Sequence, residues 1–249
     1  MNKTFETSIK AIILSAGQGR RLLPLTKNSP KCLLSISGRT IIEWQIDALL
    51  TAGIEEIIVV TGFQTNQVEE LLQQRYSNYK KIKILFNPFF QVADNLASCW
   101  IARSAMDCDF ILLNGDTIFD KSLLSKVLES KSAPITLSID YKKIYDEDDM
   151  KVQLTNNGLV QHVNKTLPTD QIDAESIGLT YFRSNGPMLF REAVEEALRY
   201  PAELNSWYLS IIDMLARKNL VSVCKISGHR WCEIDYPPDL IKAQELFGK

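Results

Sequence analysis

Short apolar runs alternate with amphipathic stretches through the first half of the chain. The runs of strand length are 11–14, 57–60, 82–86 and 110–114, and the stretches with helical spacing are 41–51, 66–76 and 96–105. This alternation of strand and helix predicts a mostly parallel sheet with helices on both faces. Ligands of such sheets gather at the carboxyl ends of the strands, so we expect the functional residues there.

The second half departs from this alternation. Asn156-Asn157-Gly158 separates two strand-like segments, 151–155 and 159–163, and predicts a β-hairpin. Further strands are expected at 176–182, 221–226 and 231–234, and further helices at 189–199, 207–218 and 238–247. The predicted fold is a three-layer α/β/α arrangement around a mostly parallel mixed sheet, formed by residues 1–249 as a single domain.

Composition narrows the classes of partner. The chain has 249 residues and a net charge of -2, which gives no overall attraction to nucleic acid or to an anionic membrane. Five scattered cysteines favour reduced thiols over disulfides or a zinc site, and no segment is long enough to cross a bilayer. We therefore expect a cytoplasmic protein that binds neither nucleic acid nor membrane, with homo-oligomerisation left open. The acidic run 146–149 is interpreted as a solvated turn.

A glycine-bearing, arginine-rich turn follows the first predicted strand. Gly17 and Gly19 allow positive φ and close backbone approach, so the amides of 16–20 can form a concavity that binds an anion. Arg21 and Lys31 add positive charge near this concavity. The stretch therefore predicts a polyphosphate site.

Two familiar nucleotide motifs do not fit this turn. A P-loop needs a lysine followed by serine or threonine, and residues 10–34 contain no such pair. The dinucleotide fingerprint needs a third glycine where this chain has Leu22. The turn therefore indicates a nucleotide site of another kind.

Carboxylates follow two other predicted strands. Asp116 comes directly after the apolar run 110–114, with Gly115 leaving room for a bulky ligand. Glu233 and Asp235 face the same side of the strand predicted at 231–234, because side chains alternate along a strand. Mg²⁺ is usually held by one or two carboxylates plus phosphate oxygens. Asp116 is the first predicted metal ligand, with Glu233 and Asp235 as candidates for the second.

The glycine-bearing turn also resembles a known family signature. The sequence Ser15-Ala16-Gly17-Gln18-Gly19-Arg20-Arg21-Leu22-Leu23-Pro24-Leu25-Thr26, followed by Pro30-Lys31, is similar to the AGxG(S/T)RLxPxT and PK motifs of the sugar-phosphate nucleotidyltransferases. This superfamily includes the bacterial phosphocholine cytidylyltransferases, the branch that this chain resembles. Arg20 departs from the pattern, because Ser or Thr is usual at that position. Gly115-Asp116 resembles the family's metal-binding GD motif.

The resemblance implies a nucleotide-diphospho-sugar transferase-like fold and an Mg²⁺-dependent nucleotidyltransferase. It would transfer a nucleoside monophosphate from an NTP, with CTP favoured, to a phospho-amino-alcohol such as phosphocholine or to a sugar phosphate, releasing pyrophosphate. The implied catalytic residues are Arg21, Lys31 and Asp116, and the metal ligands are Asp116 and Asp235. The expected nucleotide-binding residues are Ser15, Ala16, Gly17, Gln18, Gly19, Arg20, Arg21, Asn87 and Asn95. The alternative function is a non-catalytic nucleotide-sensing or regulatory protein that retains the fold.

Residues for the acceptor are spread over the second half. Lys165 is similar to the lysine of an E-K-P-like family segment, and Glu175 lies in a segment like one that meets the acceptor. Trp231 is the third predicted acceptor-binding residue. With Trp207 and Tyr208 it could supply an aromatic cage for a choline-like group, because quaternary ammonium ions bind over aromatic faces.

Overall fold

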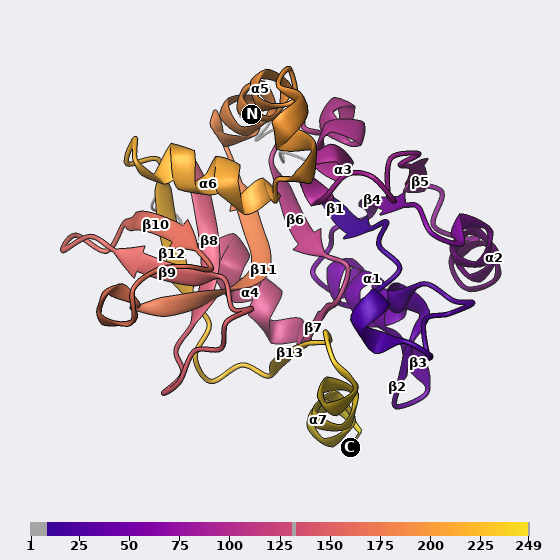
Figure 1. Cartoon of the computed structure of the whole chain (residues 1–249). Helices are drawn as coiled ribbons and strands as arrows, with labels where there is room; N and C mark the ends of the chain where they lie inside the picture. Colours follow the sequence, from indigo (N-terminus) through magenta and orange to yellow (C-terminus); the bar gives the residue numbers. More distant parts are fainter. Residues whose placement is uncertain (1–8, 131–132, 249) are drawn as a thin grey trace, which may run out of the picture.

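A mixed sheet forms the centre of the computed structural model, which describes residues 9–130 and 133–248 (Figure 1). Within these residues it has nine strands. Its parallel part runs, in spatial order, β6 (Phe110–Asn114), β1 (Lys10–Ser15), β4 (Glu56–Thr61) and β5 (Ile82–Phe86). Leu14 pairs with Asn114 across β1 and β6, so both strands end at the same edge of the sheet. The segments that leave these two ends therefore lie side by side.

A mostly antiparallel extension continues the sheet beyond β6, in which β12 runs parallel to β8. Its strands are β11 (Ala174–Phe182), β8 (Ile135–Asp140), β9 (Lys151–Leu154), β10 (Val160–Asn164) and β12 (Val221–Lys225). One edge of β11 pairs with β8, and the other edge pairs with β6 at residues 179–182 and with β9 at residues 174–175. The hairpin predicted around Gly158 is confirmed: β9 and β10 are antiparallel, and Gly158 has a φ of 76°. The prediction of a three-layer fold around a mixed sheet is also confirmed, as the helices show.

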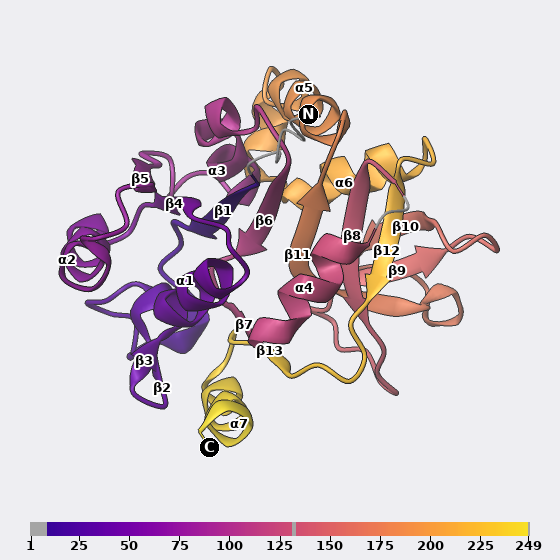
Figure 2. The same ribbon diagram turned by 180° about the vertical axis from the view of Figure 1, so that it is seen from behind.

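Helices cover both faces of the sheet (Figures 1 and 2). Ile12 and Leu14 of β1 belong to the core on the face covered by α3 (Asn95–Ile101), α5 (Gly186–Ala197) and α6 (Tyr208–Ala216). Ala11 and Ile13 belong to the core on the opposite face, under α1 (Ile41–Thr51), α2 (Thr65–Tyr76) and α4 (Lys121–Glu129). The apolar run in β1 thus buries side chains on both faces, as expected for a central parallel strand.

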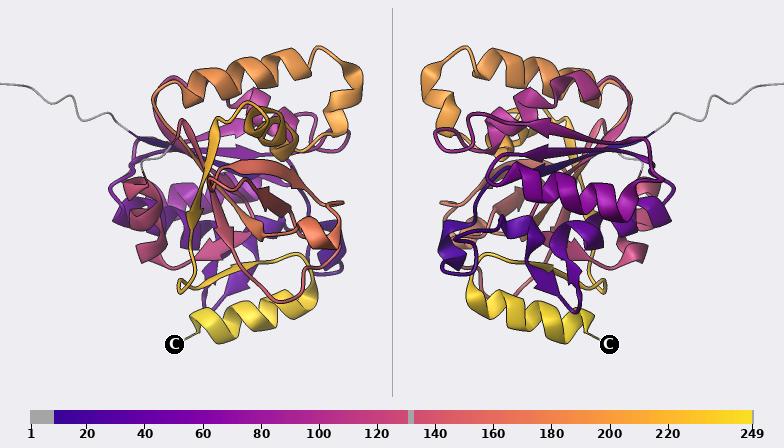
Figure 3. Two further views of the ribbon diagram at one scale, coloured as in Figure 1. Left: turned by 90° about the vertical axis from the view of Figure 1, so that its left-hand side faces the viewer. Right: turned by 90° about the vertical axis from the view of Figure 1, so that its right-hand side faces the viewer.

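A smaller core lies below the sheet edge, where α7 (Pro237–Phe247) packs (Figure 3). Next to it β13 (Trp231–Glu233) pairs antiparallel with β7 (Thr117–Phe119), and β2 (Ser35–Ile36) pairs with β3 (Arg39–Thr40). Next to the β13–β7 pair, the backbone amide of Ile234 donates a hydrogen bond to the backbone carbonyl of Asp116 at 3.1 Å. The pairing of β13 with β7 therefore brings the segment after β6 next to the segment after β13.

Short 3₁₀ helices complete the fold: η1 (Arg20–Leu22), η2 (Lys31–Leu33), η3 (Arg103–Ala105), η4 (Thr169–Gln171) and η5 (Pro201–Asn205). The helix expected at 96–105 is α3 followed by η3. The predicted elements omit β7, α4 and β8, although Leu123, Leu124 and Val127 of α4 have helical spacing and the apolar residues of β8 alternate with polar ones. No helix in the described ranges is long and apolar enough to cross a membrane.

Candidate active site

The glycine-bearing turn after β1 has a fixed shape. The Thr26 hydroxyl donates to the Gly19 carbonyl at 2.8 Å, and the Gln18 amide donates to the Thr26 carbonyl at 3.1 Å. Gly19 has a φ of 77°, and a Cβ there would lie 2.8 Å from the Cβ of Lys31. A Cβ on Gly17 would meet nothing within 4 Å. Gly19 is thus required by the fold and by Lys31, whereas Gly17 borders open space.

Lys31 joins two other predicted site residues. Its Nζ lies 2.8 Å from Asp116 Oδ2 and 2.6 Å from Asp235 Oδ1. Burial lowers the pKa of Lys31, but the two carboxylates outweigh burial and raise it. Lys31 is therefore a protonated side chain that bridges the ends of β6 and β13. These residues lie more than 80 positions apart along the chain.

Gly115 makes the position of Asp116 possible. Its amide donates to the Leu14 carbonyl at 3.0 Å, and a Cβ on Gly115 would lie 2.4 Å from that same carbonyl oxygen. Only glycine fits against the end of β1 at this point. The chain can therefore turn sharply after β6 and direct Asp116 toward Lys31.

A cavity of about 200 Å³ opens at this sheet edge. It is lined by Leu14, Ser15, Gly17, Gly19, Lys31, Cys32, Gly115 and Asp116, and we call it the glycine cavity. Arg21 lies beside it on η1, with NH1 3.5 Å from Asp235 Oδ2 and NH2 3.2 Å from Asp148 Oδ1. Arg20 is exposed and does not line this cavity. The structure thus places backbone, lysine and arginine groups together around a space suited to an anion.

The carboxylates near Lys31 exceed its charge. Glu233 is half-buried, and its pKa is raised well above the ordinary value, first by burial and then by the charges of Asp116 and Asp235. No group of three or more metal-ligating side chains occurs in the ranges that the structure describes. Mg²⁺, however, is commonly held by one or two carboxylates with phosphate oxygens completing its coordination. The donor set of Asp116 and Asp235, with its surplus negative charge, fits this ion.

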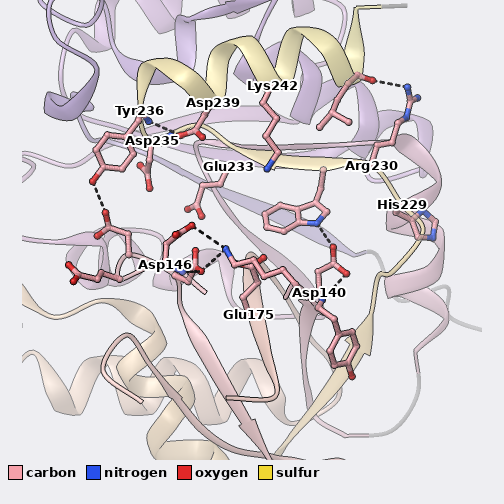
Figure 4. Close-up of a pocket in the computed structure, with 17 residues that line it drawn as sticks. Asp140, Asp146, Glu175, His229, Arg230, Glu233, Asp235, Tyr236, Asp239 and Lys242 are labelled. Atoms are coloured by element: carbon pink, nitrogen blue, oxygen red, sulfur yellow. Dashed lines mark hydrogen bonds and ion pairs between the residues drawn. The ribbon is translucent and has the colours of Figure 1, made fainter. Parts of the chain in front are cut away.

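A second cavity, of about 590 Å³, lies between the strand ends and α7 (Figure 4). Its lining comes from three parts of the chain: 140–149, Glu175 and 229–246. Nine of the lining residues carry a carboxylate, and three carry a lysine or arginine side chain. We call it the acidic cavity. This composition favours a ligand that brings positive charge.

Two of the predicted acceptor-binding residues line the acidic cavity. The indole Nε1 of Trp231 donates to Asp140 Oδ2 at 2.7 Å, which fixes the orientation of the ring. Glu175 Oε2 lies 2.9 Å from Lys142 Nζ, which also contacts Asp149 at 2.5 Å. Burial raises the pKa of Glu175 to about 7, although Lys142 opposes the shift. Trp231 and Glu175 thus belong to one network of charged and polar groups.

Lys165 lies apart from this lining. Its Nζ is 3.5 Å from Asp148 Oδ1 and 4.5 Å from the centre of the Trp207 ring. Tyr208, by contrast, is fully buried in the core under α6. An aromatic cage that includes Tyr208 is therefore ruled out, because that ring cannot reach a ligand in the acidic cavity.

The two predicted asparagines form internal hydrogen bonds. Asn87 is buried; its Oδ1 accepts from the Phe89 amide at 2.9 Å, and its Nδ2 donates to Ser98 Oγ at 3.0 Å. Asn95 Oδ1 accepts from the Tyr208 amide at 2.8 Å, which links α3 to α6. Neither residue lines the glycine cavity or the acidic cavity.

Three polar residues of the site were not predicted. Asp140, Lys142 and Asp148 reach it from the end of β8 and the following segment, 141–149. The acidic run at 146–149 is not simply a solvated turn, since Asp148 and Asp149 pair with cations at the site. The sequence carried no signal for this, because the path of the segment depends on tertiary contacts.

The fold and the site define the class: an α/β protein with a cavity lined by glycines, Lys31 and Asp116 at the carboxyl ends of parallel strands. A family model described as Nucleotidyl transferase matches residues 10–151, more than half of the chain. The chain belongs to this nucleotidyltransferase family. The resemblance of residues 15–31 to the family signature is thereby confirmed.

Relatives of known activity include cytidylyltransferases. The chain is 29% identical over 253 residues to CTP:phosphoglutamine cytidylyltransferase of Campylobacter jejuni, covering 93% of this chain and 98% of the relative. It is 29% identical over 140 residues to choline-phosphate cytidylyltransferase of Streptococcus pneumoniae, covering 56% and 55%. The solved CTP:phosphocholine cytidylyltransferase of Streptococcus pneumoniae has the same fold, with a TM-score of 0.77 and 22% identity over 96% of this chain and 98% of that one.

Proposed function

We propose that the protein is an Mg²⁺-dependent cytidylyltransferase that transfers CMP from CTP to a small phosphorylated acceptor carrying an amine. One observation carries the proposal: Lys31 lines the glycine cavity and is ion-paired to Asp235, which lines the acidic cavity. The two cavities therefore meet at this cluster. A triphosphate in the first and an acceptor in the second would bring the α-phosphate and the acceptor phosphate together at Lys31.

The reaction is an in-line displacement at phosphorus. An oxygen of the acceptor phosphate attacks the α-phosphorus of CTP, the bond from that phosphorus to the bridging oxygen breaks, and pyrophosphate leaves. The attacking phosphate is already ionised near neutral pH, so no general base is needed. The protein supplies mainly position and positive charge.

Different residues bind the outer phosphates of CTP and stabilise charge at its α-phosphate. The amides of 17–20 and Arg21 hold the β- and γ-phosphates, and protonated Lys31 stabilises charge that develops at the α-phosphate. Asp116 and Asp235 would hold Mg²⁺, which neutralises charge on phosphate oxygens when it is bound. The ion pairs of Lys31 fix its position before substrate arrives, so little reorganisation is required.

The acidic cavity supports an acceptor with a positively charged group. Carboxylates outnumber lysine and arginine side chains in its lining, and Trp231 and Tyr236 add aromatic surface, which attracts cations. The two relatives described above act, by name, on phosphoglutamine and on choline phosphate. We favour a phospho-amino-alcohol or aminophosphonate over a neutral sugar phosphate. The five free thiols favour a reducing compartment, and we place the activity in the cytoplasm.

A matrix of substrates tests the proposal. Pyrophosphate release would be measured for CTP, UTP, dTTP, ATP and GTP against phosphocholine, phosphoethanolamine, 2-aminoethylphosphonate and glucose 1-phosphate, with Mg²⁺ and with EDTA. We expect release with CTP and an amine-bearing acceptor, lost in EDTA. CTP binding without turnover for any acceptor would support the nucleotide-sensing alternative.

A further inference from the structure

One segment of the chain lies across both sides of the site. Residues 141–149 connect β8 to β9 and line the acidic cavity, and we call them the strap. At its base, Lys142 pairs with Asp149, and Asp149 Oδ2 accepts from the Asp146 amide at 2.6 Å. These contacts hold the strap in a compact turn beside the cavity (Figure 4).

Asp148 extends from this turn to three distant parts of the chain. One of its carboxylate oxygens accepts from the Tyr236 hydroxyl at 2.6 Å. The other lies 3.2 Å from an Arg21 guanidinium nitrogen and 3.5 Å from Lys165 Nζ. The hydrogen bond from Tyr236, with the charges of Arg21 and Lys165, lowers the pKa of Asp148, which keeps it ionised. One carboxylate thus joins the glycine-bearing turn, the hairpin and the start of α7.

Arg21 and Lys165, the two cations that Asp148 contacts, are both suited to binding phosphate. Arg21 holds the β- and γ-phosphates in the proposed function, and Lys165 is a predicted acceptor-binding residue whose ammonium group can bind the acceptor phosphate as a point charge. An ionised carboxylate offers them the same chemistry as a phosphate: negative oxygens that accept charge-assisted hydrogen bonds. Both Asp148 and Arg21 are partly exposed, with 38% and 45% of their side-chain surface accessible. Partly exposed ion pairs are weak individually and exchange readily with another anion.

We infer that Asp148 is an internal competitor for substrate phosphate, which holds the strap against Arg21 and Lys165 until the phosphates of the substrates displace it. This inference rests on the phosphate-binding role of Arg21 in the proposed function and on the acceptor-binding role predicted for Lys165. Triphosphate at Arg21 removes one partner of Asp148, and acceptor phosphate at Lys165 removes another. Asp148 then keeps only its hydrogen bond with Tyr236, while Lys151 Nζ, which donates to the carbonyls of Asp146 and Glu147, still holds the strap at its base. The part of the strap that carries Asp148 is released, and the acidic cavity opens to the acceptor.

The competition has a measurable consequence. A polyanion that binds at Arg21 must break the ion pairs of Asp148, which lowers its apparent affinity. A neutral side chain at this position should therefore strengthen binding. Two partly exposed pairs predict an effect of about 3- to 10-fold in the dissociation constant. A ligand with little negative charge should gain much less than a triphosphate.

The experiment measures binding of inorganic tripolyphosphate by calorimetry at low salt to the unmodified protein and to Asp148→Asn. Asp170→Asn is the matched control: Asp170 is exposed, and no ion pair forms there among the described residues. We expect about 3- to 10-fold tighter binding for Asp148→Asn and no change for Asp170→Asn. A second variant, Tyr236→Phe, keeps the charge of Asp148 but removes its shortest contact, and should tighten binding by a smaller factor.

The outcomes separate this inference from the proposed function. Unchanged or weaker binding in folded Asp148→Asn, or no binding to either protein, overturns the inference. Should Asp148→Asn fail to fold, unchanged or weaker binding in Tyr236→Phe overturns it. Tripolyphosphate binding needs no turnover. Tighter binding in a protein that transfers no nucleotide would therefore support the competitor while contradicting the cytidylyltransferase. Turnover of CTP without tighter tripolyphosphate binding in Asp148→Asn would support the cytidylyltransferase and contradict the competitor.

Discussion

The glycine cavity and the acidic cavity are built in different ways. The glycine cavity, of about 200 Å³, comes mainly from one stretch, 14–32, completed by Gly115 and Asp116. Its shape depends on backbone, on glycines and on one lysine. The acidic cavity, of about 590 Å³, is lined by side chains from β8 to α7, most of them charged. Under the proposed function, phosphate handling would depend on local sequence and acceptor choice on tertiary contacts.

The largest effect is expected at the point where the cavities meet. Lys31→Ala should lower kcat by about 10²- to 10³-fold, because a preorganised charge at the reacting phosphate is lost. Its loss also leaves Asp116 and Asp235 without their shared cation, so some loss of stability is expected. Steady-state kinetics would be compared with Lys27→Ala, an exposed lysine in the same loop. A kcat within two-fold of the unmodified protein would remove Lys31 from the chemistry.

Two glycines test whether the shape of the glycine cavity depends on its local backbone. Gly19→Ala should destabilise the protein by about 1–2 kcal/mol, since φ is positive there, and should displace Lys31. A small shift of a catalytic group costs up to about 100-fold in rate, so activity should fall by at least about 10-fold. Gly17→Ala should leave the melting temperature unchanged, because its Cβ meets open space. Equal melting temperatures for both variants would contradict the packing described for Gly19.

A tryptophan tests whether the acidic cavity receives the acceptor. Trp231→Phe keeps an aromatic ring but loses the hydrogen bond to Asp140, so the ring is no longer fixed in place. We expect KM for the acceptor to rise by about 3- to 10-fold, with KM for CTP unchanged. Trp100→Phe on α3 is the control. If KM for CTP rises instead, the division of substrates between the two cavities is wrong.

A pH dependence of stability, with no direct effect on the chemistry, is expected at Glu175. Its pKa is raised from about 4.5 to about 7 in the folded protein, first by burial. The folded state therefore binds a proton that the unfolded state has lost between these values, and stability falls as pH rises through this window. The slope is at most about 1.4 kcal/mol per pH unit. Urea unfolding at pH 5, 6, 7 and 8 should show a shallower fall for Glu175→Gln, and parallel curves would exclude Glu175 as the cause.

The same contrast explains what could be predicted from the sequence. The turn at 16–20 and Asp116 follow apolar strands directly, so their position at one sheet edge follows from the parallel order of β1 and β6. Lys31 lies further along the loop that begins with this turn. Glu233 and Asp235 follow from strand alternation, and both line the acidic cavity. The layers of the fold follow from hydrophobic periodicity.

The other polar residues of the site could not be predicted, because their roles depend on contacts between distant segments. Asp140, Lys142 and Asp148 belong to a charged stretch whose local pattern resembles any exposed turn. Asn87 and Asn95 carry side chains suited to a base, yet the structure uses them to fix the loop after β5 and to link α3 with α6. A polar side chain in a loop serves structure or ligand according to its neighbours, and those neighbours come from other parts of the chain.

The central claim is that CMP passes from CTP to an acceptor where Lys31, Asp116 and Asp235 converge. Its most direct test uses CTP labelled at the α-phosphate, Mg²⁺ and 2-aminoethylphosphonate or phosphocholine, with products separated by chromatography. The account predicts that the label appears in a CMP-acceptor conjugate with the unmodified protein, and that Asp116→Asn folds but forms almost none. Label that stays in CTP with every acceptor, or a conjugate formed equally by Asp116→Asn, would contradict it.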